Sequence, residues 1–331
     1  MKIAVIYNAP IPSLYDARGE SMAEAGVLDA VRAVRRAIRS LGHSCIEVPL
    51  APPLSGVHQA LASIHADVVF NLFEGFAGLP QTEAGLAGML EDLGLPFTGS
   101  AAAALALSLD KPDAARVLRR SGIRTPDHQL LDTGNIESFR LNFPCIVKPC
   151  ADDSSHGLSE NSVIFDLAAL AGEVKATVER YDGAPALVEE FLPGREFNVT
   201  VFGNVRPEVL PLSEIIYTLP EGLPKILTFA AKWKPQSAYF QNTTVKCPAR
   251  VTPELAAELR AAALAAVAAI GCRGYARVDM RLDAAGCPVV MEVNANPDIA
   301  PGTGVARQTR ASGLSYKSMV ERIIDFALEA A

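Results

Sequence analysis

The chain has 331 residues, of which 50% are hydrophobic, and a formal net charge of −7. A chain of this length is expected to form two or three domains with sizeable cores. The acidic balance and the lack of a basic run argue against nucleic acid as the main partner, whereas a nucleotide needs only a few local positive charges. The apolar runs are too short for a signal peptide or a membrane span, so we expect a cytoplasmic protein without a membrane partner.

Buried-type strands alternate with helices over residues 1–105. The pattern predicts strands at 2–8, 44–50 and 67–73, and helices at 21–41, 57–64 and 81–93. The first helix begins at a capping-box pattern from Ser21 to Glu24. This order predicts an open parallel α/β sheet. Ligands bind beyond the carboxyl ends of such strands, so the loops after Asn8 and Phe73 are candidates to contact substrate or, equally, simple connections.

The middle of the chain predicts an α+β arrangement. A helix begins at Asp110-Lys111-Pro112, with aspartate as its cap. Strands follow at 143–149, 162–165 and 186–191, a helix at 167–179, and a hairpin at 196–203 and 205–212. Residues 214–248 are rich in Pro, Gly and Thr and are expected to be irregular, and such long loops are usually functional or mobile.

Two strands near the carboxyl end carry the main metal-site hypothesis. Residues 275–282 alternate, with Ala276, Val278, Met280 and Leu282 on one face and Arg277, Asp279 and Arg281 on the other. In residues 288–294 the same alternation places Val289, Met291 and Val293 on one face of the strand. It places Val290, Glu292 and Asn294 on the opposite face. The turn at 283–286 predicts antiparallel pairing, so Asp279, Glu292 and Asn294 would converge. Three hard oxygen ligands suit Mg²⁺, with Mn²⁺ as an alternative; incidental charges on a solvated face are the other interpretation.

Two lysines and a polar turn are candidates to bind phosphates. Lys111 begins a helix, and Lys148 lies in an otherwise apolar strand, where it must enter a cleft or pair with an anion. The turn at 152–157 contains Ser154 and Ser155 and could fold over phosphates, although an ordinary hairpin turn gives the same pattern. Lys232 in the long loop could close over a γ-phosphate, or Trp233 beside it could simply anchor the loop.

Three further side chains are candidates for nucleotide binding or catalysis. Glu189 could accept a hydrogen bond from an adenine amine and Glu196 could hold ribose hydroxyls, while a solvated strand end is the alternative for the adjacent Glu189 and Glu190. Arg277 shares a face with Asp279 and could stabilise a negative oxygen in a transition state. A structural ion pair between Arg277 and Asp279 is the competing interpretation.

Several of these segments together resemble the D-alanine–D-alanine ligase family of the ATP-grasp superfamily. The matching pieces are 93–100 with Asp110-Lys111, 146–149 with Ser154, Ser155 and Gly157, 188–192 with 195–197, and 277–279 with 292–297. The resemblance implies an ATP-grasp fold with an N-terminal domain at 1–105 and two ATP-clamping subdomains at 106–187 and 188–331. It also implies that ATP converts a carboxylate to an acyl phosphate, that an amine attacks it, and that the enzyme is a homodimer.

The resemblance assigns a role to each candidate residue. Lys111, Lys148, Ser154 and Ser155 would bind ATP phosphates, Glu189 and Leu192 adenine, and Glu196 ribose. Asp279, Glu292 and Asn294 would hold two Mg²⁺ ions. Arg277, Lys232 and Ser154 would take part in catalysis, with Arg277 stabilising the acyl phosphate and the tetrahedral intermediate and Lys232 reaching the γ-phosphate.

The chain departs from the family pattern where the family binds its substrates. The family's histidine-glycine after the third strand is replaced by Phe73-Glu74-Gly75, and its glycine after Asn296-Pro297 by Asp298. Glu24 falls near the position of the family's amine-binding glutamate but also fits the capping box. Three functions therefore stay open: a ligase for D-alanine or a related pair, a biosynthetic ligase with other substrates, and a nucleotide-binding module without catalysis.

Overall fold

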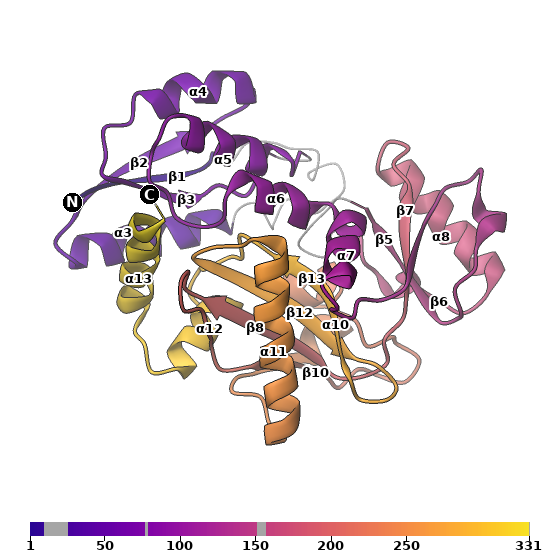
Figure 1. Ribbon diagram of the computed structural model, residues 1–331. Helices are drawn as coiled ribbons and strands as arrows, with labels where there is room; N and C mark the ends of the chain where they lie inside the picture. The colour runs from indigo at the N-terminus through magenta and orange to yellow at the C-terminus, as the bar shows by residue number, and fades with distance from the viewer. Residues whose placement is uncertain (10–25, 77–78, 151–156, 331) are drawn as a thin grey trace.

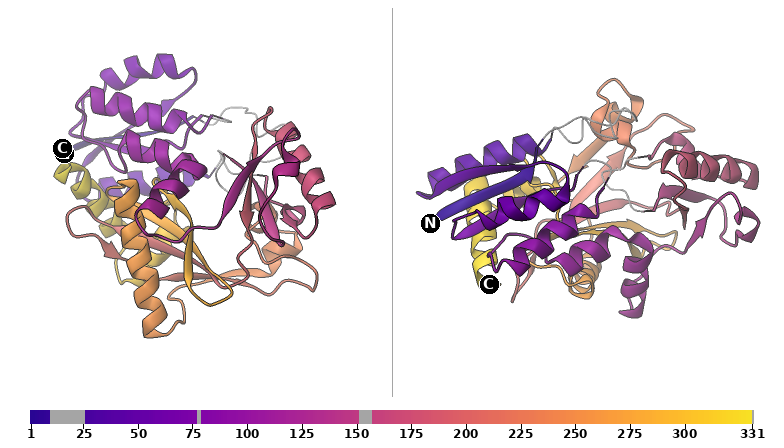
Figure 2. Two further views of the ribbon diagram at one scale, coloured as in Figure 1. Left: turned by 45° about the vertical axis from the view of Figure 1, so that its right-hand side comes forward. Right: turned by 90° about the horizontal axis from the view of Figure 1, so that it is seen from above.

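The computed structural model describes residues 1–9, 26–76, 79–150 and 157–330. Within these ranges the chain forms three sheets, one of three parallel strands, one of four antiparallel strands and one of six antiparallel strands (Figure 1). The six-stranded sheet lies below the other two in Figure 2, left, where the N-terminal and central sheets stand on opposite sides. The predicted mixed α/β class is confirmed.

The N-terminal sheet has the order β2-β1-β3, from β1 (Lys2–Asn8), β2 (Ser44–Leu50) and β3 (Val68–Leu72). Alternate residues of β1 face two different cores, one covered by α4 (Leu54–Ala62) and α5 (Thr82–Asp92) and the other by α3 (Val27–Ser40). Burial on both faces explains why these strands are almost wholly apolar. The predicted parallel sheet is confirmed, whereas the capping box from Ser21 to Glu24 lies outside the described residues.

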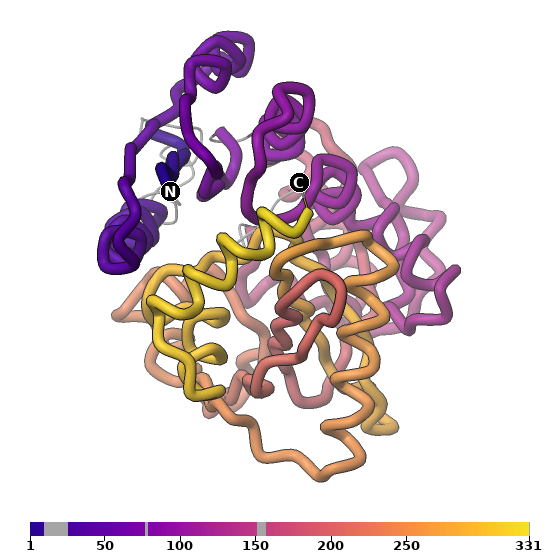
Figure 3. The backbone as a smooth tube through the Cα atoms, turned by 60° about the vertical axis from the view of Figure 1, so that its left-hand side comes forward, coloured from indigo at the N-terminus to yellow at the C-terminus, as the bar shows by residue number. Residues whose placement is uncertain are grey.

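The last helix returns to the N-terminal sheet. α13 (Tyr316–Glu329) is capped by the Ser315 side chain and packs against α3, so the first and last segments of the chain share one core. Figure 3 traces this return along the yellow end of the tube. None of the helices in the described part of the chain combines the length and hydropathy needed to cross a bilayer.

Two short helices connect the N-terminal sheet to the rest. α6 (Ala102–Leu109) was not predicted; α7 (Lys111–Arg120) was, and the Asp110 side chain accepts a hydrogen bond from the Asp113 amide as expected of a cap. Both helices contribute to the core beneath α11 (Pro253–Ile270) rather than to the central sheet. Lys111 is thereby held beside the six-stranded sheet.

The central sheet has the order β4-β7-β5-β6, from β4 (His128–Leu131), β5 (Cys145–Pro149), β6 (Val163–Ile164) and β7 (Ala186–Glu190). The short helices η1 (Ile136–Ser138) and η2 (Glu160–Ser162) flank it, and α8 (Leu167–Arg180) covers one face. β4 was not predicted, because its four residues are mostly half-buried or exposed. Ile146 pairs with Glu189, and Lys148 with Leu187, so Lys148 and Glu189 share the face away from α8.

The six-stranded sheet contains β8 (Glu196–Phe202), β9 (Glu208–Val209), β10 (Ser213–Tyr217), β11 (Thr243–Lys246), β12 (Tyr275–Leu282) and β13 (Pro288–Asn294). α11 covers one face, and α12 (Gly304–Ala311) contacts β8 from the other. The prediction that 214–248 is irregular was wrong. This segment contains β10, β11, α9 (Phe229–Trp233) and α10 (Ala238–Gln241). β10 and β11 complete the sheet beside β8.

A β-bulge changes the phase of β13. Asp279 pairs with Glu292, but the next residue, Met280, pairs with Val290, so Met291 is the extra residue. Val290 therefore lies with Val293 in the core under α11. The prediction that Val290 shares the face of Glu292 was wrong for this reason, whereas the common face of Glu292 and Asn294 is retained because both follow the bulge.

Candidate active site

The predicted metal ligands lie on adjacent strands of the six-stranded sheet. Asp279 is directly opposite Glu292, and Arg277 is directly opposite Asn294. Opposed residues in an antiparallel pair have Cβ atoms about 4.5–5.5 Å apart. These four side chains therefore form one compact group on the face away from α11.

Asp279 is engaged by two donors in this group. Arg277 Nε and a terminal nitrogen of its guanidinium each donate to one carboxylate oxygen of Asp279 at 2.8 Å. Asn198 on β8 donates to the same carboxylate at 2.7 Å. The Arg277–Asp279 ion pair that was the competing interpretation is thus present. It fixes the guanidinium beside the other oxygen ligands.

The donor set fits Mg²⁺. It comprises two carboxylates and the Asn294 side-chain amide, whose oxygen also accepts from the backbone N–H of Asn296 at 2.9 Å. No group of three His, Cys, Asp or Glu side chains suited to a metal occurs in residues 1–9, 26–76, 79–150 and 157–330. Mg²⁺ commonly takes only one or two carboxylates and completes its octahedron with waters and phosphate oxygens. The residues present would hold such an ion only together with a phosphate ligand.

Lys111 lies against the metal-type ligands. Its Nζ is 3.7 Å from a Glu292 carboxylate oxygen. Two adjoining pockets share Lys111 and Glu292 in their walls, and one of them also contains Glu189. Lys111 is the first residue of α7 and directly follows the capping residue Asp110, so the start of this helix places the lysine here. A cation at this point can neutralise phosphate oxygens that approach the carboxylates.

Lys148 forms an ion pair with Glu189. Lys148 Nζ lies 2.6 Å from a Glu189 carboxylate oxygen, and the side chains are 16% and 7% exposed. The expectation that a lysine in this strand would enter a cleft or pair with an anion is confirmed. Both side chains are mostly withdrawn from water, so neither charge is stable alone. Lys148 requires Glu189 or an anionic ligand, and Glu189 requires Lys148 or a cationic ligand.

Glu196 occupies a buried network at the start of β8. It is 6% exposed and accepts a hydrogen bond from the Tyr217 hydroxyl at 2.7 Å, and its carboxylate lies 3.7 Å from Arg281. Burial raises the pKa of Glu196, while Arg281 and Tyr217 act in the opposite direction. Burial and the Glu196 charge together raise the pKa of Tyr217 well above its usual value.

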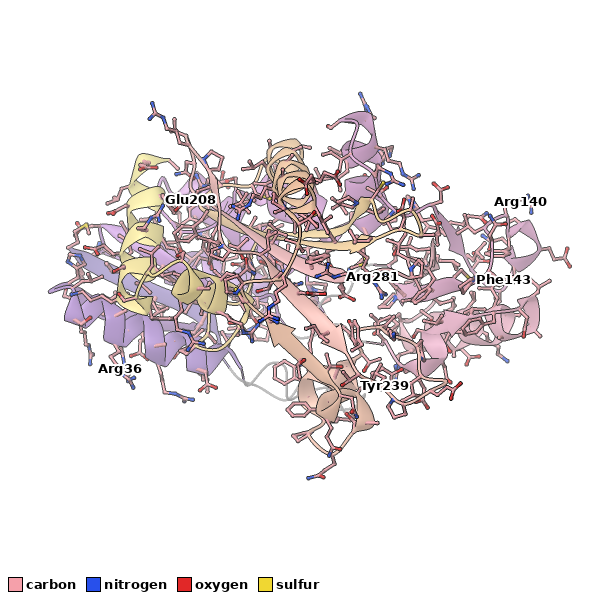
Figure 4. All side chains as sticks on the ribbon, turned by 90° about the horizontal axis from the view of Figure 1, so that it is seen from below. Arg36, Arg140, Phe143, Glu208, Tyr239 and Arg281 are labelled. Carbon is pink, nitrogen blue, oxygen red and sulfur yellow. The ribbon has the colours of Figure 1, made fainter. Side chains whose placement is uncertain are left out.

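Arg281 is a buried arginine beside Glu196 to which the sequence patterns gave no role. It is 4% exposed and donates to the Gly194 carbonyl at 3.2 Å and the Lys225 carbonyl at 2.8 Å. Its guanidinium also lies over the Phe191 ring, 5.2 Å from the centroid. Figure 4 shows Arg281 near the middle of the molecule, whereas the labelled Arg36 and Arg140 point outward at its edges. The sequence contained one signal for Arg281: it lies at alternate positions with Arg277 and Asp279 on β12 and therefore on the same face of the sheet.

The remaining predicted residues fall in three places. Lys232 is in the last turn of α9. Burial raises the pKa of Asp298, and the charges of Arg277 and Lys232 oppose that rise. Leu192 is 4% exposed and directly follows the Lys148–Glu189 region of the central sheet. Trp233 is half-buried, its ring lies 6.4 Å from that of Phe229, and its indole N–H is buried without a partner among the described residues. Ser154 and Ser155 lie outside the described residues.

Comparison with known proteins identifies the family. Residues 117–325 match the model of the D-Ala–D-Ala ligase C-terminus. A D-alanine–D-alanine ligase of Moorella thermoacetica is 32% identical over 99% of this chain and 100% of its own. A Sinorhizobium fredii protein named only as uncharacterized is 37% identical over 78% of this chain and 74% of its own.

The fold comparison agrees. The crystal structure of the D-alanine–D-alanine ligase from Bacillus anthracis matches with a TM-score of 0.77 and 22% identity, covering 100% of this chain and 98% of that one. At this level of identity the likeness establishes the fold. The ATP-grasp fold and the family resemblance predicted from the sequence are both confirmed, and the chain belongs to the D-alanine–D-alanine ligase family.

Proposed function

We propose that the chain is an ATP-dependent carboxylate–amine ligase that joins two amino acids and releases ADP and phosphate. The observation that carries this proposal is the group formed by Arg277 with Asp279, Glu292 and Asn294 on one sheet face. A protein that only binds a nucleotide has no need of an arginine positioned for a developing oxyanion. Membership of the ligase family supports the same reaction class.

ATP is the proposed phosphoryl donor. A solved neighbour of the same fold, the Bacillus anthracis ligase, was crystallised with ATP. In this chain Lys111, Lys148, Ser154 and Ser155 would bind its phosphates, Glu189 and Leu192 its adenine, and Glu196 its ribose. Asp279, Glu292 and Asn294 would hold Mg²⁺ or Mn²⁺, which would neutralise phosphate charge.

The chain's own residues position the reaction. A carboxylate oxygen of the first substrate attacks the γ-phosphorus, and the bond to the β-phosphate oxygen breaks, which gives an acyl phosphate and ADP. The amine nitrogen of the second substrate then attacks the acyl carbon, loses a proton and expels phosphate. Arg277, which donates to Asp279, would stabilise the oxyanion formed in this attack, and Lys232 would accompany the transferred phosphate. Most of the rate enhancement would come from positioning and charge neutralisation.

The substrate pair defines two candidate activities. D-alanine with D-alanine is the pair named in the family relatives. A different amino acid pair is favoured by Glu74 and Asp298, which stand where the family has histidine-glycine and glycine.

We also propose a homodimer, and domains at 1–105, 106–187 and 188–331; since β7 ends at Glu190, the second boundary is better placed after that residue.

A substrate panel tests the proposal. Purified protein with ATP and Mg²⁺ would be given pairs of D- and L-amino acids, with ADP and phosphate measured and products identified by mass. We expect phosphate release that requires an amino acid pair, and a product equal to their sum minus water. The matched control is Arg277→Ala, which should bind an ATP analogue and release no phosphate above background. Phosphate release that ignores every pair would contradict the ligase assignment.

A further inference from the structure

A side chain of α12 enters the hydrogen-bond ladder of the six-stranded sheet at Thr200 on β8. The Thr200 carbonyl accepts from the Leu210 amide at 3.0 Å, and in a regular antiparallel pair the Thr200 amide would donate back to the same residue. It donates instead to the Gln308 side-chain oxygen at 2.9 Å. The strand pairing is interrupted here, because β9 ends at Val209 and β10 begins only at Ser213. Gln308 therefore takes the place of a strand carbonyl at this interruption.

The Gln308 amide is buried in a fixed orientation. Gln308 and Thr200 are both 0% exposed, and Val305 on the same helix lies in an apolar core with Leu210. Only the amide oxygen can accept from a backbone N–H, so the Thr200 donor determines which way the side chain points. A buried amide without a hydrogen bond costs free energy, so this contact favours one placement of the helix. The hydrogen bond thus holds α12 at a defined position on β8.

The strand position held by Gln308 is opposite Arg277. Thr200 pairs with Arg277 in the ladder between β8 and β12. The backbone groups of Thr200 bond away from β12, so this is a non-hydrogen-bonded pair, with Cα atoms about 4.5 Å apart. α12, which lies beside β8 in Figure 1, contacts the same arginine: a β-carbon added at Gly304, one turn before Gln308, would lie 3.7 Å from Arg277 Cδ. Arg277 therefore lies next to both the strand and the helix that Gln308 joins.

The segment that leads into α12 is itself held by hydrogen bonds. Asn296, just after β13, donates to the Phe73 carbonyl at 3.0 Å. Further along, the Thr303 hydroxyl lies 2.9 Å from the Asp298 carbonyl oxygen. A segment fixed in this way has little freedom to absorb a shift of the helix. A displacement of α12 would therefore be passed on to Gly304, beside Arg277.

We propose that Gln308 is a positioning residue for Arg277. By accepting from the Thr200 amide, it keeps the first turn of α12 against the aliphatic part of the Arg277 side chain, whose guanidinium donates to Asp279. The inference rests on the proposed ligase function and adds to it a buried residue that acts through the arginine. A misplacement of about 1 Å can lower a rate about 100-fold, so a small movement of Arg277 is enough to affect turnover.

Kinetics of Gln308→Met provide the first test. Methionine has a similar size but offers the Thr200 amide only a weak sulfur acceptor. We expect kcat for ADP release to fall about 10-fold while the KM for ATP changes less than about twofold, because the loss concerns the group that acts in the transition state. In an Arg277→Lys background the same substitution should change kcat less than about twofold, since the positioned guanidinium is absent. Equal losses in both backgrounds would contradict the positioning role.

Nuclear magnetic resonance provides a readout that needs no turnover. In protein labelled with ¹⁵N-arginine, the Arg277 Nε–H signal, identified by its loss in Arg277→Lys, reports the hydrogen bond to Asp279. Its exchange with water should accelerate about 10-fold in Gln308→Met, because local opening becomes more frequent. Thr309→Val is the matched control: Thr309 is the next residue of α12 and is buried, but its hydroxyl donates within the helix, to the Val305 carbonyl. Exchange in this control should equal that in the wild type.

A second variant keeps the test decisive if Gln308→Met does not fold. Gln308→Asn retains the amide but is one methylene shorter, so its oxygen cannot reach the Thr200 amide unless α12 moves. It should accelerate the exchange of the Arg277 Nε–H as well. Unchanged exchange in the Gln308 variants, or an equal acceleration in Thr309→Val, would overturn the proposal. A wild type that releases no phosphate would contradict the ligase assignment instead, and the exchange rates would still decide whether Gln308 positions Arg277.

Discussion

Replacing Arg281 with methionine should strongly destabilise the protein. The methionine keeps apolar contact with Phe191 but removes the hydrogen bonds to the Gly194 and Lys225 carbonyls and the positive charge near Glu196. Glu196 is 6% exposed, so its charge would remain buried with only Tyr217 as a donor. Removing one partner of a buried pair costs about 3–5 kcal/mol. That is a large share of a total stability of about 5–15 kcal/mol.

The double variant Arg281→Met/Glu196→Gln isolates the ionic part of this loss. Glutamine is neutral, has nearly the same shape, and can still accept from Tyr217. We expect the double variant to be destabilised by about 2 kcal/mol less than the sum of the two single variants. The remaining loss would come from the two unpaired carbonyl groups.

The cost of Arg281→Met should also depend on pH. Burial raises the pKa of Glu196, and Arg281 opposes that rise, so the variant raises the pKa further. A group whose pKa is raised in the folded state contributes stability below its unfolded pKa and loses it as the pH rises through the folded pKa. The destabilisation by Arg281→Met should therefore be larger at about pH 8 than at about pH 5.

Urea unfolding provides the assay. The chain has one tryptophan, Trp233, whose fluorescence can be compared with far-ultraviolet circular dichroism to test for a single transition. Arg260→Met is the matched control, because Arg260 is exposed and donates one hydrogen bond, to the Val209 carbonyl. It should cost about 0.5 kcal/mol or less. Additive single-variant effects, or a loss for Arg281→Met that is constant with pH, would refute the buried-pair explanation.

Three other substitutions test the site and the fold. Arg277→Lys keeps the charge but loses the bidentate geometry, so kcat should fall about 100-fold in the ADP-release assay while the ATP analogue still binds in calorimetry. Glu292→Gln should raise the Mg²⁺ concentration for half-maximal activity at least ~10-fold, since it removes a charged oxygen ligand. Gly194→Ala would place a β-carbon 2.4 Å from the Leu282 carbonyl oxygen and should lower the free energy of unfolding by about 1–3 kcal/mol or more. Gly56→Ala, whose β-carbon meets nothing within 4 Å, should be neutral or stabilising in the same urea titration.

Short-range sequence patterns correctly predicted the elements that depend on neighbouring residues, such as an amphipathic strand and a helix cap. The alternation along β12 reports burial of one face against α11, and the aspartate before Lys111 reports a helix cap, so both were readable from neighbouring residues. The same patterns placed Asp279 and Glu292 on one face, because the turn between the strands is short. These are also the residues that anchor the proposed site.

Long-range packing determined the elements that were missed. β11 has two exposed residues and no clear alternation, and it is a strand because its backbone pairs with β10. The bulge at Met291 adds one residue to β13, and a count of alternate positions cannot detect it. The hydrogen bonds from Asn296 to the Phe73 carbonyl and to Glu83 depend on how the N-terminal sheet meets the six-stranded sheet, which no local pattern contains. The sequence therefore predicted the positions of side chains along each strand better than the packing between the two sheets.

The ion pairs at the site explain how one arrangement can suit both the ligand-free and the nucleotide-bound protein. Lys148 pairs with Glu189, Lys111 lies near Glu292, and Arg277 pairs with Asp279. In each pair the cation is a proposed phosphate or oxyanion group and the anion a proposed adenine or metal ligand. Phosphate and acyl oxygens would take over the cations, the adenine amine would meet Glu189, and Mg²⁺ would meet Asp279 and Glu292, so no buried charge would be left without a partner in either state. Nucleotide and metal should therefore bind with strong mutual dependence, because either one alone would replace only one partner in the Lys111–Glu292 and Arg277–Asp279 pairs.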